Sequence, residues 1–422
     1  MFSCKTLSRY FDKALWSLSV AMLLISSLPK LSYSQSASDS LSAAIEAELH
    51  AHSANGRYEA SVLAIIDAIN SGNLMHAVEL ADTHIQIFPK SQVGHLMRAD
   101  ALSGLTGGLS SVASNGALPK DNLQGLLHQL RNRWDHRHQQ GNDSHLKVPA
   151  NLLDIGDHPF VVVADMQRGR LYLYKNDEGQ ARLMRDYYMS VGAAGYGKQV
   201  EGDNKTPIGV YSINRYIEGQ ALPDLYGKGA FPVDYPNRYD RFLNRTGYGI
   251  WLHGTPSDTY ARSPLASEGC FVLSNDDLLD IGQYLSPEKR TPVILSDSIE
   301  WLSLSELAER RASLLAVIDQ WKQDWESLNT QAYVSHYQSE NFNLGKGDYQ
   351  AWLQRKAQIN GAKTFVQVDL DIQSLFAYPG EKDMFVVRYK QRYLSDNFSG
   401  ESSKEQLWKR DQSGKWRIIY EG

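Results

Sequence analysis

The residues best suited to chemistry are a histidine and a cysteine in two nearby segments. His253 follows the apolar run 250–252, and Cys270 ends the segment Ser267-Glu268-Gly269-Cys270. A thiol attacks an amide as its thiolate, and a free thiol with a pKa of about 8.5 is mostly protonated at neutral pH. A neighbouring imidazole can accept the proton and hold the thiolate as an ion pair. The pair indicates acyl transfer, with Cys270 as nucleophile and His253 as general base.

Cysteine usage supports this interpretation. The chain has two cysteines, and Cys4 falls in an N-terminal segment that we expect to be removed. The remaining thiol of Cys270 would face an oxidising compartment without a disulfide partner, so its presence needs a chemical reason. The alternative is an inert core cysteine. Gly269, which would let a substrate backbone approach, and the amides around Cys270, which could stabilise an oxyanion by about 3 kcal/mol each, favour the nucleophile.

The first residues have the pattern of an export signal. Basic residues precede an apolar run over 14–28, and a small-residue stretch over 32–34 ends before Gln35. The apolar run is too short to span a bilayer comfortably, so we expect residues 1–34 to be a cleaved signal peptide. The alternative is an uncleaved N-terminal anchor. In both cases the rest of the chain lies in the periplasm or cell envelope, with no membrane span after cleavage.

Charge and histidine spacing exclude two classes of partner. The full chain has 43 basic and 48 acidic residues. Removal of the signal takes away four basic residues and one acidic residue, so 39 basic and 47 acidic residues remain and the net charge is −8. Without a basic cluster, nucleic-acid binding is not expected. His136 and His138, with His128 and His145 nearby, are candidate metal ligands, but residues two apart on a helix point in different directions. A solvated helix end is the preferred interpretation, and we expect no metal and no organic cofactor.

The segment 35–150 has helical periodicity and forms an N-terminal domain. Apolar residues recur at helical spacing, with breakers between the runs, over 58–69, 74–88, 92–105 and 121–138. Pairs of helices of this kind are typical of helical repeats. The expected role of this domain is docking or homodimerisation.

The periodicity then changes to that of strands, and after residue 299 it returns to helix. A hairpin over 160–174 and short strands over 185–191, 209–213 and 249–252 predict a mainly β domain at 151–299. The segment 300–422 predicts long helices and then strands over 364–375, 383–393, 403–410 and 415–420. This order resembles the α+β cone of nuclear-transport-factor or SnoaL-like proteins.

An aromatic stripe marks the first helices of this cone. Trp321, Trp325, Tyr333 and Tyr337 recur at multiples of four residues. Such a stripe is more often core than a ligand box, and core is the preferred interpretation. We nevertheless expect the cone to offer a pocket that binds glycan or peptide.

Three motifs together resemble the L,D-transpeptidase catalytic domain of YkuD type. They are His253-Gly254, Ser267-Glu268-Gly269-Cys270 and Thr206-Pro207-Ile208-Gly209. Linking pieces also fit, including Gly197-Lys198, Glu201-Gly202-Asp203, Phe231-Pro232 and Asp234-Tyr235-Pro236-Asn237. The resemblance covers residues 155–297, roughly a third of the chain.

The resemblance implies roles for individual residues. Cys270 becomes the nucleophile and His253 the base, and the carbonyl of Gly254 holds the second imidazole nitrogen in place of a triad acid. Gly269 and Ser267 are expected to shape the oxyanion loop. Substrate-binding residues are expected at Thr206, Tyr235, Asn237, Trp251 and Thr255.

The resemblance also implies the substrate, a peptidoglycan tetrapeptide stem cleaved at the L-centre of its diamino acid with release of D-alanine. Passing the acyl group to an amine gives an L,D-transpeptidase, the expected function, and passing it to water gives an L,D-carboxypeptidase. The Glu201-Gly202-Asp203 element and the appended C-terminal SnoaL-like domain resemble a branch of the family that includes three-domain L,D-carboxypeptidases. A non-catalytic wall-binding scaffold is the second alternative. The chain departs from the family at Glu268, where histidine is common, and at Val272, where asparagine or arginine is common. The second departure leaves open how a substrate carboxylate is held.

Overall fold

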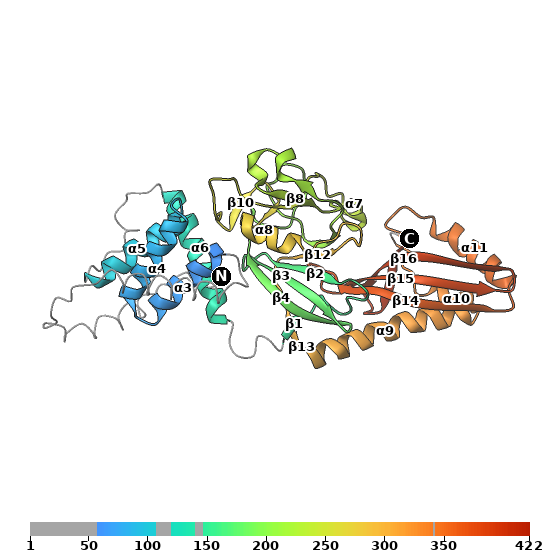
Figure 1. Cartoon of the computed structure of the whole chain (residues 1–422). Helices are drawn as coiled ribbons and strands as arrows, with labels where there is room; N and C mark the ends of the chain where they lie inside the picture. Colours follow the sequence, from blue (N-terminus) through green and yellow to red (C-terminus); the bar gives the residue numbers. More distant parts are fainter. Residues whose placement is uncertain (1–56, 107–119, 140–146, 341) are drawn as a thin grey trace. The chain divides into compact units, whose positions relative to one another are not determined.

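The computed structural model describes residues 57–106, 120–139, 147–340 and 342–422. Its elements confirm the predicted multidomain architecture, with a helical N-terminal region, a central β-rich domain and a C-terminal domain of sheet and helix (Figure 1). The described part of the chain forms two compact units, residues 60–106 and residues 57–59 with 120–422. The predicted signal peptide lies outside the described residues.

The N-terminal helices follow the predicted boundaries closely. They are α3 (Arg57–Asn70), α4 (Leu74–Ile87) and α5 (Gln92–Leu105). The buried ring of His84 holds them together, because Nδ1 lies 2.6 Å from Ser61 Oγ and Nε2 lies 2.7 Å from Ser91 Oγ. A Cβ atom on Gly94 would lie 2.4 Å from this ring, so close packing of α5 requires glycine there.

The central domain consists of two sheets with a hydrophobic core between them. One has the order β4-β3-β2-β12-β6, from strands β2 (Phe160–Asp165), β3 (Arg170–Asp177), β4 (Gln180–Tyr188), β6 (Gly209–Ser212) and β12 (Pro292–Ser296). The other has the order β11-β9-β8-β7, from β7 (Ile217–Glu218), β8 (Gly229–Pro232), β9 (Trp251–His253) and β11 (Phe271–Val272). Short strands β5 (Val191–Gly192) and β10 (Leu265–Ser267) pair in parallel. The predicted strand over 185–191 is thus divided between β4 and β5.

Short helices and one edge pair complete these layers. The helices are η3 (Gly219–Ala221), η4 (Asp224–Tyr226), α7 (Arg238–Phe242) and α8 (Asn275–Gly282). Strand β1 (Lys147–Pro149) pairs with β13 (Trp301–Ser303), which leads directly into the long helix α9 (Leu304–Glu326). Ser303 and Glu306 form a capping box that starts this helix.

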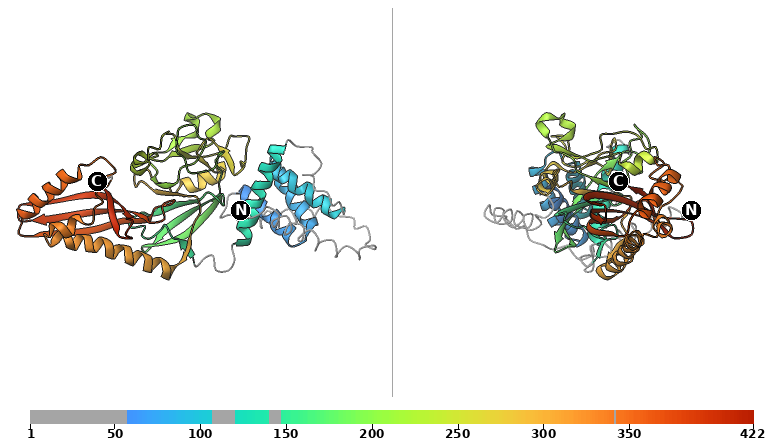
Figure 2. Two further views of the ribbon diagram at one scale, coloured as in Figure 1. Left: turned by 180° about the vertical axis from the view of Figure 1, so that it is seen from behind. Right: turned by 90° about the vertical axis from the view of Figure 1, so that its right-hand side faces the viewer.

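The C-terminal domain packs helices on one face of a four-stranded antiparallel sheet. The helices are α9, α10 (Thr330–Val334) and α11 (Tyr349–Gly361), and the strands are β14 (Val366–Ala377), β15 (Met384–Ser395), β16 (Phe398–Arg410) and β17 (Trp416–Glu421). Figures 1 and 2 show α9 running along the sheet. Trp321 and Tyr333 are fully buried, and Trp325 and Tyr337 nearly so. The aromatic stripe therefore belongs to the core.

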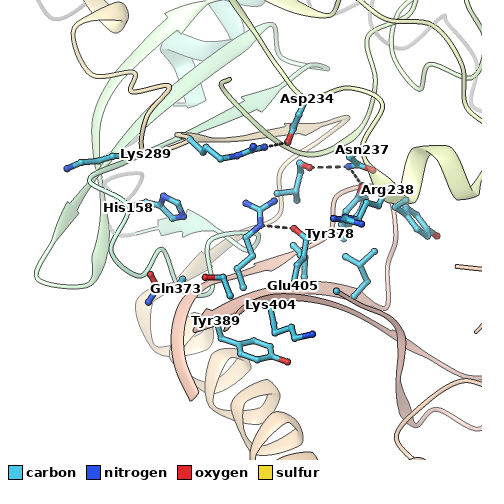
Figure 3. A pocket seen from close by; sticks show the side chains of 18 of the residues that line it. His158, Asp234, Asn237, Arg238, Lys289, Gln373, Tyr378, Tyr389, Lys404 and Glu405 are labelled. Carbon is cyan, nitrogen blue, oxygen red and sulfur yellow. Dashed lines mark hydrogen bonds and ion pairs between the residues drawn. The ribbon is translucent and has the colours of Figure 1, made fainter. Parts of the chain in front are cut away.

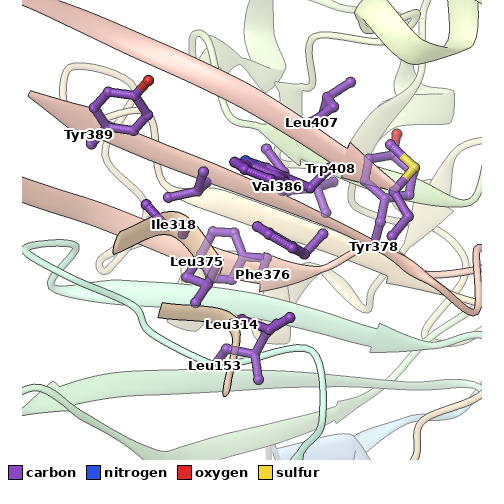
Figure 4. Packing of buried hydrophobic residues seen from close by; sticks show 14 of the residues in the cluster. Leu153, Leu314, Ile318, Leu375, Phe376, Tyr378, Val386, Tyr389, Leu407 and Trp408 are labelled. Carbon is purple, nitrogen blue, oxygen red and sulfur yellow. The ribbon is translucent and has the colours of Figure 1, made fainter. Parts of the chain in front are cut away.

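One hydrophobic cluster joins the central and C-terminal domains. It contains Val161, Val163 and Ile294 from the catalytic sheet and Leu314, Ile318, Phe376, Phe385 and Trp408 from the cone. Figure 4 shows Leu153 and Leu314 in this packing beside the strands of the cone. Asp154 and Leu375 exchange two backbone hydrogen bonds of 2.9 and 2.8 Å across the junction. Removing residues after 298 would therefore strip core from the catalytic sheet.

Helix α6 (Lys120–Gln139) and the first turn of α3 attach to the catalytic sheet through buried charges. The carboxylate of Glu59 accepts from Arg133 Nε at 2.7 Å and from Arg170 Nη1 at 2.8 Å. Arg170 also pairs with Asp186 at 3.1 Å, and Asp186 contacts His136. The expectation of a solvated helix end is therefore wrong for His136, which is buried by this network. Burial alone would raise the pKa of Glu59, but the two guanidinium groups outweigh it and hold the pKa below its ordinary value.

Replacing Glu59 by glutamine tests this attachment. Glu59→Gln leaves two buried guanidinium groups without their shared counter-charge, so the free energy of unfolding should fall by about 3–5 kcal/mol. Urea denaturation of the purified protein measures this change. Glu300→Gln, at an exposed pair with Arg310, is the matched control and should cost less than about 1 kcal/mol.

The same variant predicts a pH dependence. Because the folded-state pKa of Glu59 is lowered, its contribution is present above the unfolded value of 4.5 and is lost as pH falls through the folded-state pKa. The difference between wild type and Glu59→Gln should therefore shrink in acid. If Glu59→Gln lowered the free energy of unfolding at neutral pH by no more than Glu300→Gln does, the account would be contradicted.

Candidate active site

Parallel pairing of two very short strands brings His253 and Cys270 together. In the β9–β11 pair, Val272 lies opposite His253 and Phe271 lies opposite Leu252. Continuing this register places Cys270 beside Trp251, at the start of β9. Leu252 and Phe271 are fully buried, so the pairing is fixed by the core beneath the site.

The imidazole of His253 is held in one tautomer. Its Nδ1 atom lies 2.7 Å from the carbonyl oxygen of Gly254, which can only accept, so Nδ1 carries the proton and Nε2 of the neutral ring is free to accept one. The ring is 3% exposed. Burial lowers the pKa of His253 to about 4, and the charge of Arg262 also lowers it, against the opposing hydrogen bond to Gly254. The base is therefore neutral at physiological pH.

The thiol of Cys270 is also neutral in the free protein. Sγ donates to the carbonyl of Gly249 at 3.4 Å, and no hydrogen bond joins it to His253 in the described structure. Burial raises the pKa of Cys270 to about 11, although the Trp251 N–H and the charges of Arg262 and Lys198 act to lower it. The resting ion pair expected from the sequence is thus replaced by a neutral thiol beside a neutral base. A reaction that uses this pair would require proton transfer to accompany attack by sulfur.

Ser267 and Gly269 shape the nucleophile loop. Ser267 Oγ donates to the carbonyl of Cys270 at 2.6 Å and accepts from the N–H of Gly269 at 3.1 Å. Gly269 has φ +125°, and a Cβ atom there would lie 2.8 Å from the carbonyl of Lys205. Because the Gly269 amide is already bonded to Ser267, the amide of Cys270 itself is the better placed candidate for an oxyanion donor.

The sequence does not predict two residues beside the His253-Gly254 pair, Asn275 and Tyr226. Asn275 Oδ1 accepts from the N–H of Lys228 at 2.9 Å, and its Nδ2 donates to the carbonyl of Thr255 at 2.8 Å. A Cβ on Gly254 would approach Asn275 Oδ1 to 2.2 Å, so this contact requires the glycine after the histidine. The ring of Tyr226 lies 5.1 Å from that of His253, edge to face. The only sequence signal at Asn275 is that of a helix start after Ser274.

Three of the expected substrate-binding residues are buried and make hydrogen bonds within the catalytic domain. Thr206 Oγ1 accepts from the N–H of Gly192 at 2.9 Å. Tyr235 Oη donates to the carbonyl of Thr246 at 2.9 Å, and Thr255 Oγ1 donates to the carbonyl of Thr259 at 2.6 Å. Their buried positions fit a role in shaping the loops, and contact with substrate stays a prediction.

The other two lie in different places. Trp251 is half-buried beside the site, with its ring 4.9 Å from that of Tyr226. Asn237 starts α7, and its Nδ2 donates to Val210 O at 3.1 Å and to Tyr378 Oη at 2.8 Å. Asn237 therefore lies at the junction with the C-terminal domain.

Asn237 lines a second candidate site, a cleft of about 1000 Å³ between the catalytic domain and the cone sheet. Figure 3 shows His158 and Asp234 facing Glu405 and Gln373 across it. Each wall carries an ion pair, Asp234 with Arg290 at 2.6 Å and Glu405 with Arg388 at 2.7 Å. The residues that line this cleft do not include the histidine–cysteine pair.

Two absences hold for the described residues, one of a metal-ligand cluster and one of a bilayer-spanning helix. No group of three or more histidine, cysteine, aspartate or glutamate side chains there is arranged to hold a metal ion. None of the helices in the same ranges is both long enough and apolar enough to cross a bilayer.

Comparison with known proteins agrees with this architecture. Escherichia coli putative L,D-transpeptidase YafK is 31% identical over 117 residues, which span 28% of this chain and 43% of that protein. The structure of Bdellovibrio bacteriovorus Bd1075 is 27% identical with a TM-score of 0.58, covering 65% of this chain and 97% of that one. The helical cell shape determining protein Pgp2 from Campylobacter jejuni is 26% identical with a TM-score of 0.55, covering 68% and 98%.

Family comparison divides the chain in the same way. Residues 159–295 match the L,D-transpeptidase catalytic domain (YkuD), and residues 313–422 match the Cds6 C-terminal NTF2-like domain. The central part of this chain is therefore an L,D-transpeptidase catalytic domain of the YkuD family, followed by a C-terminal NTF2-like domain.

Proposed function

We propose that the chain is an exported cysteine acyl-transfer enzyme that acts on peptidoglycan stem peptides. The observation that carries the proposal is the state of His253, held by Gly254 in the tautomer whose Nε2 can accept a proton, one strand away from Cys270. The family of the catalytic domain supports the substrate class. Export to the periplasm or envelope rests on the N-terminal sequence pattern.

The proposed reaction has two halves. Nε2 of His253 takes the proton of Cys270 as sulfur attacks the carbonyl at the L-centre of the diamino acid. The N–H of Cys270 stabilises the oxyanion, and collapse expels D-alanine, whose amine takes the proton from the imidazolium. An acceptor then attacks the thioester, gives its proton to His253, and releases the thiol.

The acceptor separates two activities. We propose an amine, which makes the protein an L,D-transpeptidase. Water is the second candidate, because the C-terminal NTF2-like domain supports the resemblance to the three-domain L,D-carboxypeptidase branch. The N-terminal helices are proposed to dock or to dimerise the enzyme.

Replacing the nucleophile tests the proposal. Cys270→Ala and Cys270→Ser should both abolish turnover of tetrapeptide muropeptides, because alanine lacks the attacking atom and the serine hydroxyl has a much higher pKa. Mass analysis of the products measures this, with Glu309→Gln as an exposed control outside both candidate sites. Dimers joined between diamino acids identify a transpeptidase, and trimmed tripeptides alone a carboxypeptidase. Neither product from a folded wild-type protein that binds wall would indicate the scaffold.

The pH profile tests the role of His253. Because a buried imidazole with a pKa of about 4 accepts a proton only when neutral, kcat/KM should stay level from neutral pH downward and fall with a midpoint near 4. His253→Ala should lower turnover by about 10²- to 10⁴-fold and slow alkylation of Cys270 by iodoacetamide at neutral pH. Circular dichroism at each pH checks that the fold persists. A midpoint near the ordinary histidine value of 6.5, or identical alkylation profiles in both proteins, would contradict this role.

Replacing two arginines that line the cleft beside the cone tests the expected wall-binding role of the C-terminal domain. Arg238 and Arg241 on its rim are exposed and form no ion pair within the described chain. Replacing both by glutamate should weaken retention on intact wall about threefold or more, through charge repulsion, and leave turnover of a short soluble stem unchanged. Arg215→Glu, on the exposed surface elsewhere, is the control. Equal loss on both substrates would indicate a structural role.

A further inference from the structure

The loop between His253 and Cys270 carries one basic residue, Arg262, and the fold fixes its backbone. The carbonyl of Arg262 accepts from Tyr188 Oη at 2.9 Å and from Ser190 Oγ at 3.1 Å. Both donors lie at the end of the catalytic sheet, where β4 leads into β5. The position of Arg262 is therefore set by the same sheet that supports the reacting residues.

The guanidinium group is directed along the nucleophile element. Its Nη2 donates to the carbonyl of Ala266, the residue before Ser267, and Ser267 in turn bonds to the carbonyl of Cys270. The side chain is half-buried and takes part in no ion pair within the described residues. A half-buried cation without a carboxylate partner is costly, so a function is a better explanation than packing.

Arg262 also dominates the local electrostatics. Among charged groups it has the largest effect on the pKa of Cys270, and it is the charge that lowers the pKa of His253. The other cation near the thiol, Lys198, is 4% exposed and is bonded to Asp203 at 2.8 Å. Glu268 is exposed and acts on Arg262 only as a nearby charge. The guanidinium is thus the cation that remains available near both reacting groups.

Residues on both sides of Arg262 are held by the N-terminal segments of the same compact unit. The ring of Tyr260 stacks on that of Tyr58 with centroids 5.5 Å apart. Ser263 packs so closely on α6 that a Cβ on Gly125 would lie 2.2 Å from its Oγ. This bracing limits the movement of the loop and presents Arg262 in a fixed place.

We propose that Arg262 binds a carboxylate of the stem peptide beside the bond that Cys270 attacks, and thereby selects stems with a free carboxylate at that place. The inference rests on the proposed function and supplies the substrate-carboxylate partner that Val272 cannot provide. Two carboxylates share this chemistry, that of the terminal D-alanine and that on the side chain of the diamino acid. Binding either one also neutralises the charge that opposes protonation of His253, so substrate arrival strengthens the base.

Alkylation of Cys270 tests the inference without any turnover. Iodoacetate carries a carboxylate and iodoacetamide does not, so a nearby cation favours the first reagent. Arg262→Gln should lower the ratio of the iodoacetate rate to the iodoacetamide rate by about tenfold, and Arg262→Lys, which keeps the charge, should retain most of it. Arg215→Gln is the control for an exposed arginine. A ratio unchanged in Arg262→Gln overturns the inference, whether or not the protein turns over stems.

Three stem peptides then identify the carboxylate. Arg262→Gln should lower kcat/KM on the natural tetrapeptide by about 10- to 100-fold. If the terminal carboxylate is bound, a tetrapeptide amide should be a poor substrate that is insensitive to the substitution. If the side-chain carboxylate is bound, a stem with lysine at the third position should instead be the poor substrate that is insensitive to Arg262→Gln. If Arg262→Gln lowers kcat/KM equally on all three peptides, the inference is overturned. If wild type turns over none of them but Arg262→Gln still lowers the ratio of alkylation rates, only the proposed function is overturned.

Discussion

The desolvated surroundings of His253 and Cys270 are the constraint on which the proposed site depends. His253 and Cys270 lie over the core of the catalytic domain, and burial favours the neutral form of each. The hydrogen bond to Gly254 fixes which nitrogen of His253 is the base. The free protein therefore holds Cys270 as a poorly reactive thiol. In the proposed reaction, the substrate supplies the electrophile and its carboxylate balances the charge of Arg262.

The surrounding domains support this arrangement physically. The cluster shared with the cone covers one face of the catalytic sheet, so the C-terminal domain contributes core as well as surface. The buried network around Glu59 attaches α6 and the first turn of α3 to β3 and β4. The same N-terminal segments brace the loop that carries Arg262, through the Tyr58–Tyr260 stack. The parts outside the catalytic domain thus act on its geometry.

The sequence predicted those features that local pattern determines. Helices α3, α4 and α5 end within about two residues of the predicted limits, because breakers follow each apolar run. The His253 and Cys270 motifs identified the domain family. Strand β9 overlaps the predicted strand over 249–252, but β11 is too short for periodicity to place, and the parallel register of the two depends on distant core residues. Asn275, Arg262 and the cleft beside the cone arise from contacts between distant segments, which no single segment encodes.

Nuclear magnetic resonance of the His253 ring tests the central claim most directly. In protein labelled with ¹⁵N-histidine, with His253→Ala for assignment, the nitrogen shifts report the protonation of Nδ1 and Nε2 separately. The account predicts a neutral ring at pH 7 with the proton on Nδ1, and titration only near pH 4. An imidazolium with both nitrogens protonated at pH 7 would show that the resting enzyme holds a thiolate–imidazolium pair, and would contradict the account.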